Sequence, residues 1–236
     1  MLSSAVILAG GLGTRLQSKL SDLPKAMAPV CGRPFLDYQL LFLRKHGIKK
    51  VHLSIGHLAE KIMLHYGPSF EDIALDYVTE KSAMGTGGGI GLAMERSSET
   101  ELFVLNGDSY FDMDLHDFHA KHASSGAQHS LALREVENAS RYGTIQLDSE
   151  NRVIAFREKS GKSQKGLINA GIYILNRKLY LDQTPAHTQF SVEKDYFEES
   201  LDEVCIKGFV YKGYFMDIGI PEDFEQAQHD FKRFAH

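Results

Sequence analysis

The chain has 236 residues, of which 43% are hydrophobic and 24% charged, and its formal net charge is −5. These values are typical of a globular protein large enough to bury a sizeable core. The sequence contains no Lys/Arg-rich run, which disfavours a nucleic-acid partner. No apolar run approaches the roughly 20 residues that cross a bilayer, and residues 1–4 lack the basic start of a signal peptide. Cys31 and Cys205 lie far apart, so we expect reduced thiols in a cytoplasmic protein without a membrane partner.

The first half of the chain alternates between strand-like and helix-like stretches. Apolar runs predict strands at 6–8, 51–55, 73–78 and 102–105, and helical periodicity predicts helices at 35–46, 58–66, 87–94 and 115–122. This alternation indicates an α/β fold with a doubly wound, mostly parallel sheet of mixed character. Ligands bind at the carboxyl ends of the strands in such sheets.

The second half is richer in strands, which are predicted at 131–136, 144–147, 153–158, 168–175 and 203–211. A hairpin turn is expected at 149–151, and Pro221 is placed to begin a last helix. No Pro-rich or low-complexity linker separates the halves. We therefore predict one domain, 1–236, with a nucleotide-binding half of about 1–125 and a strand-rich, substrate-facing half of about 126–236.

A glycine-rich segment follows the first predicted strand. It reads Ala9-Gly10-Gly11-Leu12-Gly13-Thr14-Arg15-Leu16, and Pro24-Lys25 follows it. Glycines at a strand end let backbone N–H groups approach a phosphate, and Arg15 and Lys25 add positive charge. The segment is neither a dinucleotide fingerprint, because Leu16 replaces the third glycine, nor a Walker A loop, because no Gly-Lys-Ser/Thr is present. It predicts a loop that grips a triphosphate, and the missing glycine disfavours an NAD-dependent dehydrogenase.

Two aspartates follow apolar stretches that are more than a hundred residues apart. Asp108 ends Leu105-Asn106-Gly107-Asp108, and Asp217 lies in Phe215-Met216-Asp217-Ile218-Gly219. Mg²⁺ commonly takes one or two protein carboxylates and completes its shell with water and phosphate oxygens. Each aspartate alone is more often a turn or cap residue. Together with the glycine-rich segment, they predict a magnesium site.

The order of these motifs resembles that of the sugar-1-phosphate nucleotidyltransferases. The resemblance covers nearly the whole chain and includes the glycine-rich segment, Met84-Gly85-Thr86-Gly87-Gly88, Asn106-Gly107-Asp108, Tyr142-Gly143, Glu158-Lys159, Asn169-Ala170-Gly171-Ile172-Tyr173 and the Asp217 segment. It implies a Rossmann-like, GT-A-like fold. Within the family, the length and the motif sequences of this chain are most similar to those of guanylyltransferases that act on D-glycero-α-D-manno-heptose 1-phosphate. The chain departs from the family pattern at Ser18, Ser160 and Ile220.

The resemblance implies a role for each matching residue. The residues expected to bind the nucleotide are Leu8, Ala9, Gly10, Gly11, Gly13, Thr14, Arg15, Lys25, Glu80, Gly85, Thr86, Asn106 and Asp108. Those expected to bind the sugar phosphate are Gly143, Glu158, Lys159, Asn169 and Asp217. Arg15, Lys25 and Asp108 are implied to be catalytic, and Asp108 and Asp217 to hold Mg²⁺. The implied substrates are a nucleoside triphosphate and a sugar 1-phosphate, and a homo-oligomer is possible.

The identity of the base follows less directly. Glycines at 85–89 are expected to let the backbone approach a flat ring, and Glu80 is expected to face the base edge. A carboxylate only accepts hydrogen bonds, and guanine offers two adjacent donors. This favours GTP, although uracil also offers one donor and Glu80 could be a solvated loop residue. A uridylyltransferase acting on N-acetylmuramate 1-phosphate and a regulatory subunit without catalytic activity are the alternatives.

His116, His119 and His122 are spaced three apart on a predicted helix. Two of them could share a face and bind a transition metal. No Cys or carboxylate completes a tetrahedral set, so we expect all three to be solvated.

Overall fold

The computed structural model describes residues 2–11, 13, 22–157, 161 and 163–234. The strands are β1 (Ser4–Leu8), β2 (Pro29–Val30), β3 (Arg33–Pro34), β4 (Lys50–Ile55), β5 (Ser69–Phe70), β6 (Ile73–Thr79), β7 (Glu101–Asn106), β8 (Ser109–Phe111), β9 (His129–Val136), β10 (Thr144–Leu147), β11 (Val153–Arg157), β12 (Gly166–Asn176), β13 (Ile206–Tyr211) and β14 (Phe215–Asp217). The helices are α1 (Phe35–Lys45), α2 (Ala59–Tyr66), α3 (Gly85–Glu95), α4 (Leu115–Ser125), α5 (Arg177–Gln183) and α6 (Pro221–Asp230), with 3₁₀ turns η1 (Lys25–Met27) and η3 (Phe231–Phe234) and a π-helix η2 (Val192–Glu198).

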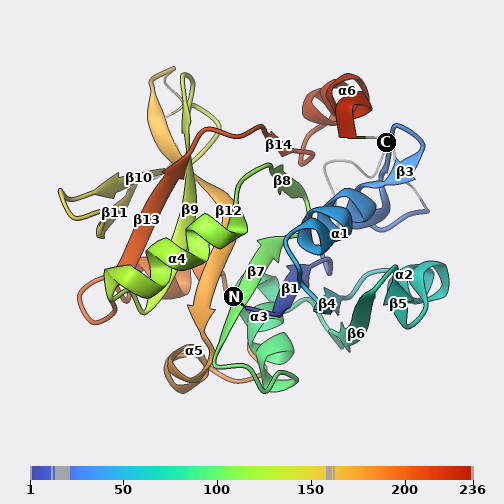
Figure 1. Ribbon diagram of the computed structural model, residues 1–236, viewed down its shortest axis with the longest axis horizontal. Helices are drawn as coiled ribbons and strands as arrows, with labels where there is room; N and C mark the ends of the chain where they lie inside the picture. Colours follow the sequence, from blue (N-terminus) through green and yellow to red (C-terminus); the bar gives the residue numbers. More distant parts are fainter. Residues whose placement is uncertain (1, 12, 14–21, 158–160, 162, 235–236) are drawn as a thin grey trace.

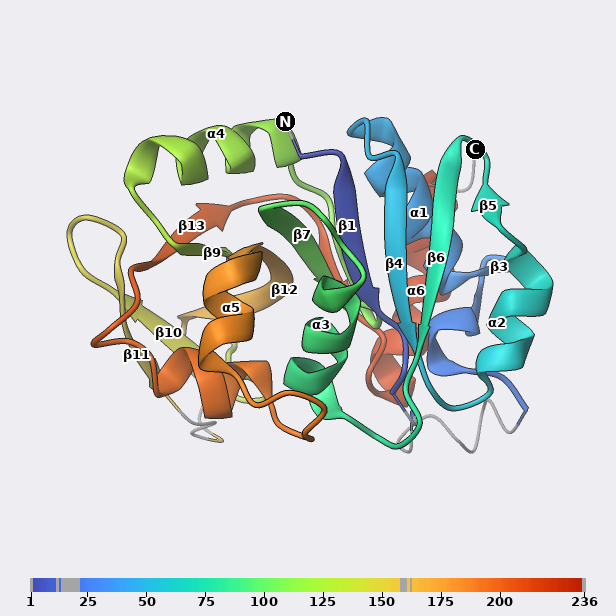
Figure 2. The ribbon, with the colours of Figure 1, turned by 90° about the horizontal axis from the view of Figure 1, so that it is seen from below.

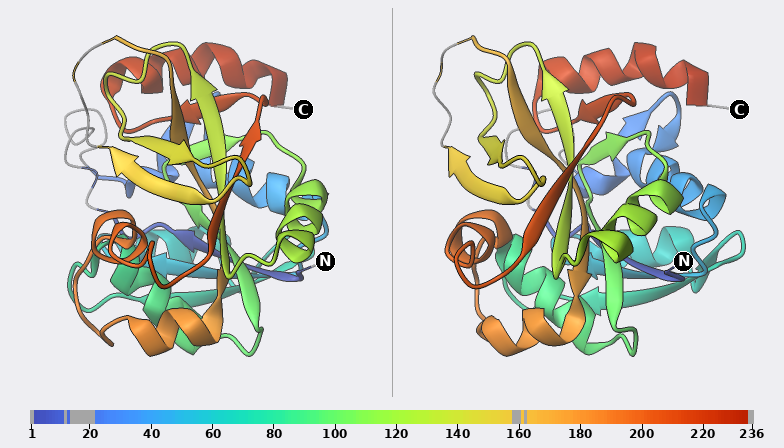
Figure 3. Two further views of the ribbon diagram at one scale, coloured as in Figure 1. Left: turned by 90° about the vertical axis from the view of Figure 1, so that its left-hand side faces the viewer. Right: turned by 60° about the vertical axis from the view of Figure 1, so that its left-hand side comes forward.

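The centre of the main sheet is parallel, as the βαβ pattern predicts. The strands run in the order β11-β10-β12-β7-β1-β4-β6-β5, and β7, β1, β4 and β6 are parallel to one another (Figure 1). β12 joins β7 in the antiparallel direction, and β9 pairs with β12 and β13. The antiparallel β10–β11 hairpin, yellow in Figure 3, lies at the sheet edge opposite β5 and β6. The expected mixed α/β sheet is thus confirmed.

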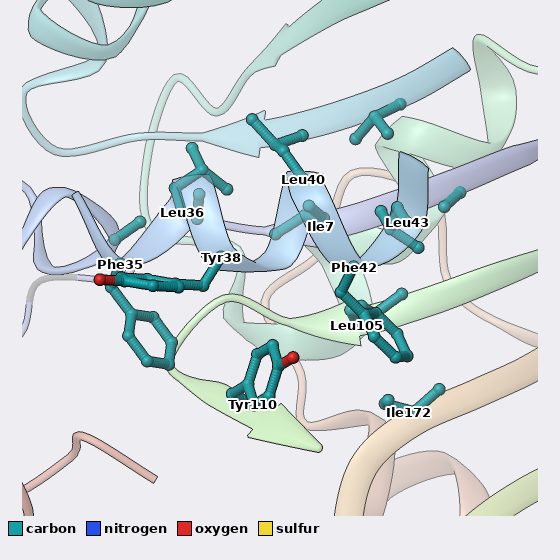
Figure 4. Packing of buried hydrophobic residues seen from close by; sticks show 14 of the residues in the cluster. Ile7, Phe35, Leu36, Tyr38, Leu40, Phe42, Leu43, Leu105, Tyr110 and Ile172 are labelled. Atoms are coloured by element: carbon teal, nitrogen blue, oxygen red, sulfur yellow. The ribbon is translucent and has the colours of Figure 1, made fainter. Parts of the chain in front are cut away.

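Successive side chains of β1 point into two different apolar layers. Ile7 belongs to an apolar cluster that includes residues of α1, α2, α4 and α6, whereas Val6 belongs to a second cluster that includes residues of α3, α5 and η2. Figure 4 shows Leu36, Leu40 and Leu43 of α1 beside Ile7, and Figure 2 shows α3 and α5 on the other face. Burial of one such aliphatic side chain is worth about 1.5–3 kcal/mol. The doubly wound arrangement follows from this burial on both faces of the sheet.

Most predicted elements are confirmed within a few residues, and the exceptions have local causes. The strand expected at 203–211 begins only at Ile206, because Glu203 and Val204 form turns closed by hydrogen bonds to the Ser200 carbonyl. α5, η2 and the short strands β2, β3, β5, β8 and β14 were not predicted. In the described part of the chain, no helix is both long and apolar enough to cross a membrane.

Candidate active site

Two cavities open at the carboxyl ends of the central strands. The glycine-lined cavity, of 420 Å³, is bounded by the ends of β1 and β7, the glycine-rich segment, Lys25 and the start of α3. The arginine-lined cavity, of 570 Å³, is bounded by β10, β11, η2 and the segment after β14, and includes Arg141 and Arg157. Asn106 at the end of β7 lines both cavities. The two predicted halves of the site therefore adjoin each other.

The backbone after β1 forms much of the glycine-lined cavity. Leu8, Ala9, Gly10, Gly11 and Gly13 all line it, as the sequence predicts. Gly13 has a φ of +60°, and a Cβ there would lie 3.0 Å from the Cβ of Lys25. A side chain at this position would be strained and would press on the lysine. Thr14 and Arg15, which were expected to bind the nucleotide, lie outside the described residues.

Lys25 lies opposite the end of β7 and forms an ion pair with Asp108. Its Nζ donates a hydrogen bond of 2.6 Å to Oδ2 of Asp108. The lysine side chain is only 15% exposed, whereas that of Asp108 is 41% exposed. The lysine is thus largely covered by protein, and both side chains line the glycine-lined cavity. Lys25 and Asp108 therefore lie together at the wall of this cavity.

A short antiparallel ladder brings Asp217 to Asp108 from more than a hundred residues away. β14 pairs with β8 so that Asp217 lies opposite Ser109, and the Ile218 N–H donates to the Asp108 carbonyl at 2.9 Å. Oδ1 of Asp217 accepts a hydrogen bond of 2.6 Å from the Gly219 N–H. Burial and the nearby negative charge of Asp108 raise the pKa of Asp217 to about 6. Two adjacent, crowded carboxylates are a suitable set of oxygen ligands for a divalent cation.

The sequence left open whether Glu80 is a solvated loop residue, and the structure shows that its carboxylate is hydrogen-bonded within the fold. Its Oε1 accepts from Ser54 Oγ at 2.8 Å, and its Oε2 accepts from the Met84 N–H at 3.1 Å. A Cβ at Gly10 would lie 2.4 Å from Oε1, so the absence of a side chain there makes room for the carboxylate. Glu80 thus lines the glycine-lined cavity in one fixed orientation.

The glycines at the start of α3 have a different use from the one predicted. Gly85 and Thr86 line the glycine-lined cavity, but a Cβ at Gly87 would lie 2.1 Å from the Phe190 ring. At Gly88 it would lie 2.4 Å from the Thr188 carbonyl oxygen. These two glycines therefore let the segment 188–190 pack closely on α3, rather than making room for a base.

The arginine-lined cavity contains three of the five residues predicted for the sugar phosphate. Gly143, Asn169 and Asp217 line it, whereas Glu158 and Lys159 lie outside the described residues. The Asn169 side chain is held at both ends, because Nδ2 donates to Tyr173 Oη at 2.7 Å and Oδ1 accepts from the Gly171 N–H at 2.9 Å.

Several polar residues of this cavity were not predicted. Arg141, Arg157, Glu193, Glu198 and Asp223 line it as well, and Arg141 and Asp223 form an ion pair of 3.0 Å. They come from a loop, the end of β11, the π-helix η2 and the first turn of α6, none of which carries a short sequence motif for this chemistry. A π-helical turn often marks a functional site, but its position is not visible from hydrophobic periodicity.

The expectation that three neighbouring histidines are solvated is wrong for one of them. His122 is 3% exposed, and its two ring nitrogens contact Ser130 Oγ at 2.8 Å and Glu101 Oε1 at 3.2 Å. It faces the sheet because α4 packs on β9 and β13. Among the described residues, no three His, Cys, Asp or Glu side chains converge as a metal site. Cys31 and Cys205 are free cysteines, as expected.

Comparisons with known proteins agree with this geometry. The family model described as nucleotidyl transferase matches residues 4–233. A D-glycero-α-D-manno-heptose 1-phosphate guanylyltransferase of Aneurinibacillus thermoaerophilus is 39% identical over 98% of this chain and 99% of its own length. One of the same description from Campylobacter jejuni is 39% identical over 93% of this chain and 96% of its own.

A solved structure shows the same likeness in three dimensions. HddC from Yersinia pseudotuberculosis, complexed with GMP-PN, superimposes with a TM-score of 0.84 at 34% identity and covers 98% of this chain and 100% of its own. Because the family model matches almost the whole sequence and relatives align over nearly their full lengths, this chain belongs to the nucleotidyl transferase family.

Proposed function

We propose that this protein transfers a nucleotidyl group from a nucleoside triphosphate to a sugar 1-phosphate. An oxygen of the sugar phosphate forms a bond to the α-phosphorus, the bond from that phosphorus to the bridging oxygen breaks, and pyrophosphate leaves with the electron pair. The observation that carries this proposal is the meeting of Asp108 and Asp217 where the glycine-lined and arginine-lined cavities adjoin. One cavity suits a triphosphate and the other a sugar phosphate.

The attacking oxygen is already anionic, so the reaction requires no strong general base. Positioning and neutralisation of charge are then the main contributions to catalysis. Lys25 pairs with Asp108, beside which we place the reacting phosphate, so its ammonium can bind phosphate oxygens near the point of attack. In our proposal Gly10, Gly11 and Gly13 bind the triphosphate through the backbone, and Arg15 and Thr14 join them from the same motif.

The donor set of Asp108 and Asp217 fits Mg²⁺, which prefers oxygen ligands and accepts one or two carboxylates. Their mutual repulsion, visible in the raised pKa of Asp217, is relieved by a cation between them. When bound, the cation would neutralise phosphate charge and orient the two phosphates for in-line attack. Asp108 and Asp217 are the residues that we propose to hold it.

We propose GTP as the nucleotide. Guanine presents N1–H and the N2 amino group side by side, and the carboxylate of Glu80, fixed by Ser54 and Met84, is an acceptor for both. Relatives that align over nearly their whole length are described as guanylyltransferases, which supports the same choice. Gly85 and Thr86 would lie beside the base.

The same relatives support D-glycero-α-D-manno-heptose 1-phosphate as the acceptor, and therefore GDP-heptose as the product. We propose that Gly143 and Asn169 fix the sugar in the arginine-lined cavity, and that Glu158 and Lys159 bind its hydroxyls and phosphate. Nucleoside triphosphates are made in the cytoplasm, so we place the reaction there.

The experiment is a pyrophosphate-release assay with Mg²⁺, four nucleoside triphosphates and a panel of sugar 1-phosphates that includes the heptose. We expect release with GTP and the heptose phosphate. Release with another pair would support the proposed reaction but show that the substrates are different. Nucleotide binding without release from any pair would contradict the proposal and favour a regulatory protein. Inosine triphosphate, which lacks the N2 amino group, separately tests the contact to Glu80.

A further inference from the structure

One segment of the chain forms part of both cavities. Gln189 lines the glycine-lined cavity, and Glu193, only four residues later, lines the arginine-lined cavity. The segment follows α5 and runs into the π-helix η2, which packs on α3. A movement of this segment therefore changes the walls of both cavities at once.

The segment is attached to the start of α3 by backbone hydrogen bonds. The Phe190 N–H donates to the Met84 carbonyl at 3.1 Å, and the Gly87 N–H donates to the Phe190 carbonyl at 2.9 Å. A Cβ at Gly85 would lie 2.4 Å from that same carbonyl oxygen, so this close packing requires glycine. The start of α3 and the segment 188–193 are thus held as one unit.

Side chains continue this attachment into the arginine-lined cavity. Thr86 Oγ1 accepts from the Val192 N–H at 2.9 Å and donates to Glu193 Oε2 at 3.1 Å. Glu193 Oε1 accepts from Tyr173 Oη at 3.1 Å. Tyr173 Oη in turn accepts from Asn169 Nδ2 at 2.7 Å. An unbroken chain of hydrogen bonds thus joins a wall of one cavity to a wall of the other.

The middle of this chain has little freedom to rearrange. Tyr173 is 0% exposed, and burial raises its pKa well above the usual value, so the hydroxyl keeps its proton and remains the donor to Glu193. Oε2 of Glu193 also accepts from Ser191 Oγ at 3.0 Å. Tyr173 is the buried centre of this half-buried network, and an unpaired hydroxyl there is costly, so a shift of Glu193 favours a matching shift at Tyr173 and Asn169.

We propose that Thr86, Glu193 and Tyr173 are positioning residues that couple the two cavities, so that each substrate binds more tightly when the other is present. A shift of Thr86 when the glycine-lined cavity is occupied is passed along the chain of hydrogen bonds to Asn169 in the arginine-lined cavity. Thermodynamic linkage requires the reverse effect to be equally large. This inference rests on the proposed function.

The test measures binding of D-glycero-α-D-manno-heptose 1-phosphate by calorimetry, with and without saturating α,β-methylene-GTP, which cannot transfer its nucleotidyl group. For the wild type we expect the nucleotide to tighten sugar-phosphate binding about 5-fold or more. The coupling ratio is the Kd of the sugar phosphate without nucleotide divided by its Kd with nucleotide. In Thr86→Val and Tyr173→Phe this ratio should fall to near 1. Thr86→Ser, which keeps the hydroxyl, should have the wild-type ratio.

Two matched controls remove the same kinds of group outside the network. Thr188→Val removes a hydroxyl that donates to the Ala186 carbonyl, and Tyr196→Phe removes a buried hydroxyl bonded to His129 and Gln183. Both should keep the wild-type ratio. Because Thr86 is only half-buried, Thr86→Val carries the test even if Tyr173→Phe fails to fold.

The outcomes separate this inference from the proposed function. Absence of wild-type turnover with every nucleotide and sugar 1-phosphate pair would contradict the proposed function. With turnover present, a wild-type ratio of 1 would overturn the coupling. An unchanged ratio in Thr86→Val and Tyr173→Phe would also overturn it, even if sugar affinity fell, because a side chain that only contacts the sugar lowers affinity equally in both conditions.

Discussion

The glycine-lined and arginine-lined cavities adjoin each other but are built in different ways. The first is made largely of backbone at strand ends, with Lys25, Glu80 and Asp108 as its charged residues in the described part of the chain. The second is lined mainly by side chains, from β10, β11, the π-helix η2, the first turn of α6 and the loops between them. A phosphate can be bound by N–H groups in any such loop, whereas a sugar needs donors and acceptors at particular places. In the proposed function, this difference means that the first cavity would set the reaction and the second the acceptor.

Asp108, which lies where the two cavities meet, should give the largest effect. In Asp108→Asn the carboxylate is lost while the shape is kept, and we expect kcat to fall about 100-fold to 1000-fold. Pyrophosphate release measures it. Asp112→Asn is the matched control, because Asp112 lines neither cavity. Activity of Asp108→Asn close to that of the control would contradict the assignment.

Lys25 tests whether the glycine-lined cavity acts on the reaction independently of the sugar. In Lys25→Met we expect a loss of about 100-fold in turnover, because a positive charge beside the phosphates is removed. Calorimetry should find sugar-phosphate affinity unchanged. Lys49→Met removes an exposed lysine that pairs with Asp72 and should keep full activity. If Lys25→Met weakened sugar binding as strongly as turnover, the proposed division between the cavities would be wrong.

Two glycines of α3 test the close packing beside the glycine-lined cavity. Gly87→Ala places a methyl group against the Phe190 ring, and we expect a loss of about 1–3 kcal/mol in the free energy of unfolding. Among the described residues, no neighbouring atom would lie within 4 Å of a Cβ at Gly91, so Gly91→Ala should raise stability by about 0.5–1 kcal/mol. Urea unfolding compares the two. Equal effects would show that the packing does not require glycine.

Asp217 should affect the free energy of unfolding in a way that depends on pH. Its pKa is about 6 in the fold against 3.8 ordinarily, so the folded state holds more protons between these values and stability falls as pH rises through this window. Asp217→Asn should therefore match the wild type well below pH 4 and exceed it by up to about 3 kcal/mol above pH 6. Urea unfolding without divalent metal measures this. If the stability difference between Asp217→Asn and the wild type did not change with pH, the titration of Asp217 would not be its cause.

The sequence allowed the glycine-lined cavity to be predicted better than the arginine-lined one. Val6, Ile7 and Leu8 indicate a buried strand, and the glycines follow them directly, so fold and phosphate loop can be predicted from local patterns. Glu193 belongs to a short polar segment without periodicity, and Arg141 and Asp223 meet only through the tertiary fold. The close packing of Phe190 on Gly87 could not be predicted either, because the sequence does not show which neighbour occupies the space that a glycine leaves.

The pairing of β14 with β8 has a consequence for how the protein is made. Asp108 is synthesised near the middle of the chain, but Asp217 reaches it only through a strand close to the C-terminal helix α6. A contact of such long sequence separation forms late, since a large loop must close first. A chain still emerging from the ribosome can therefore fold β1, β4 and β7 and form most of the glycine-lined cavity well before the second aspartate arrives. Premature termination before residue 217 would leave a chain without the complete pair of carboxylates and without the buried Ile218 and Phe231.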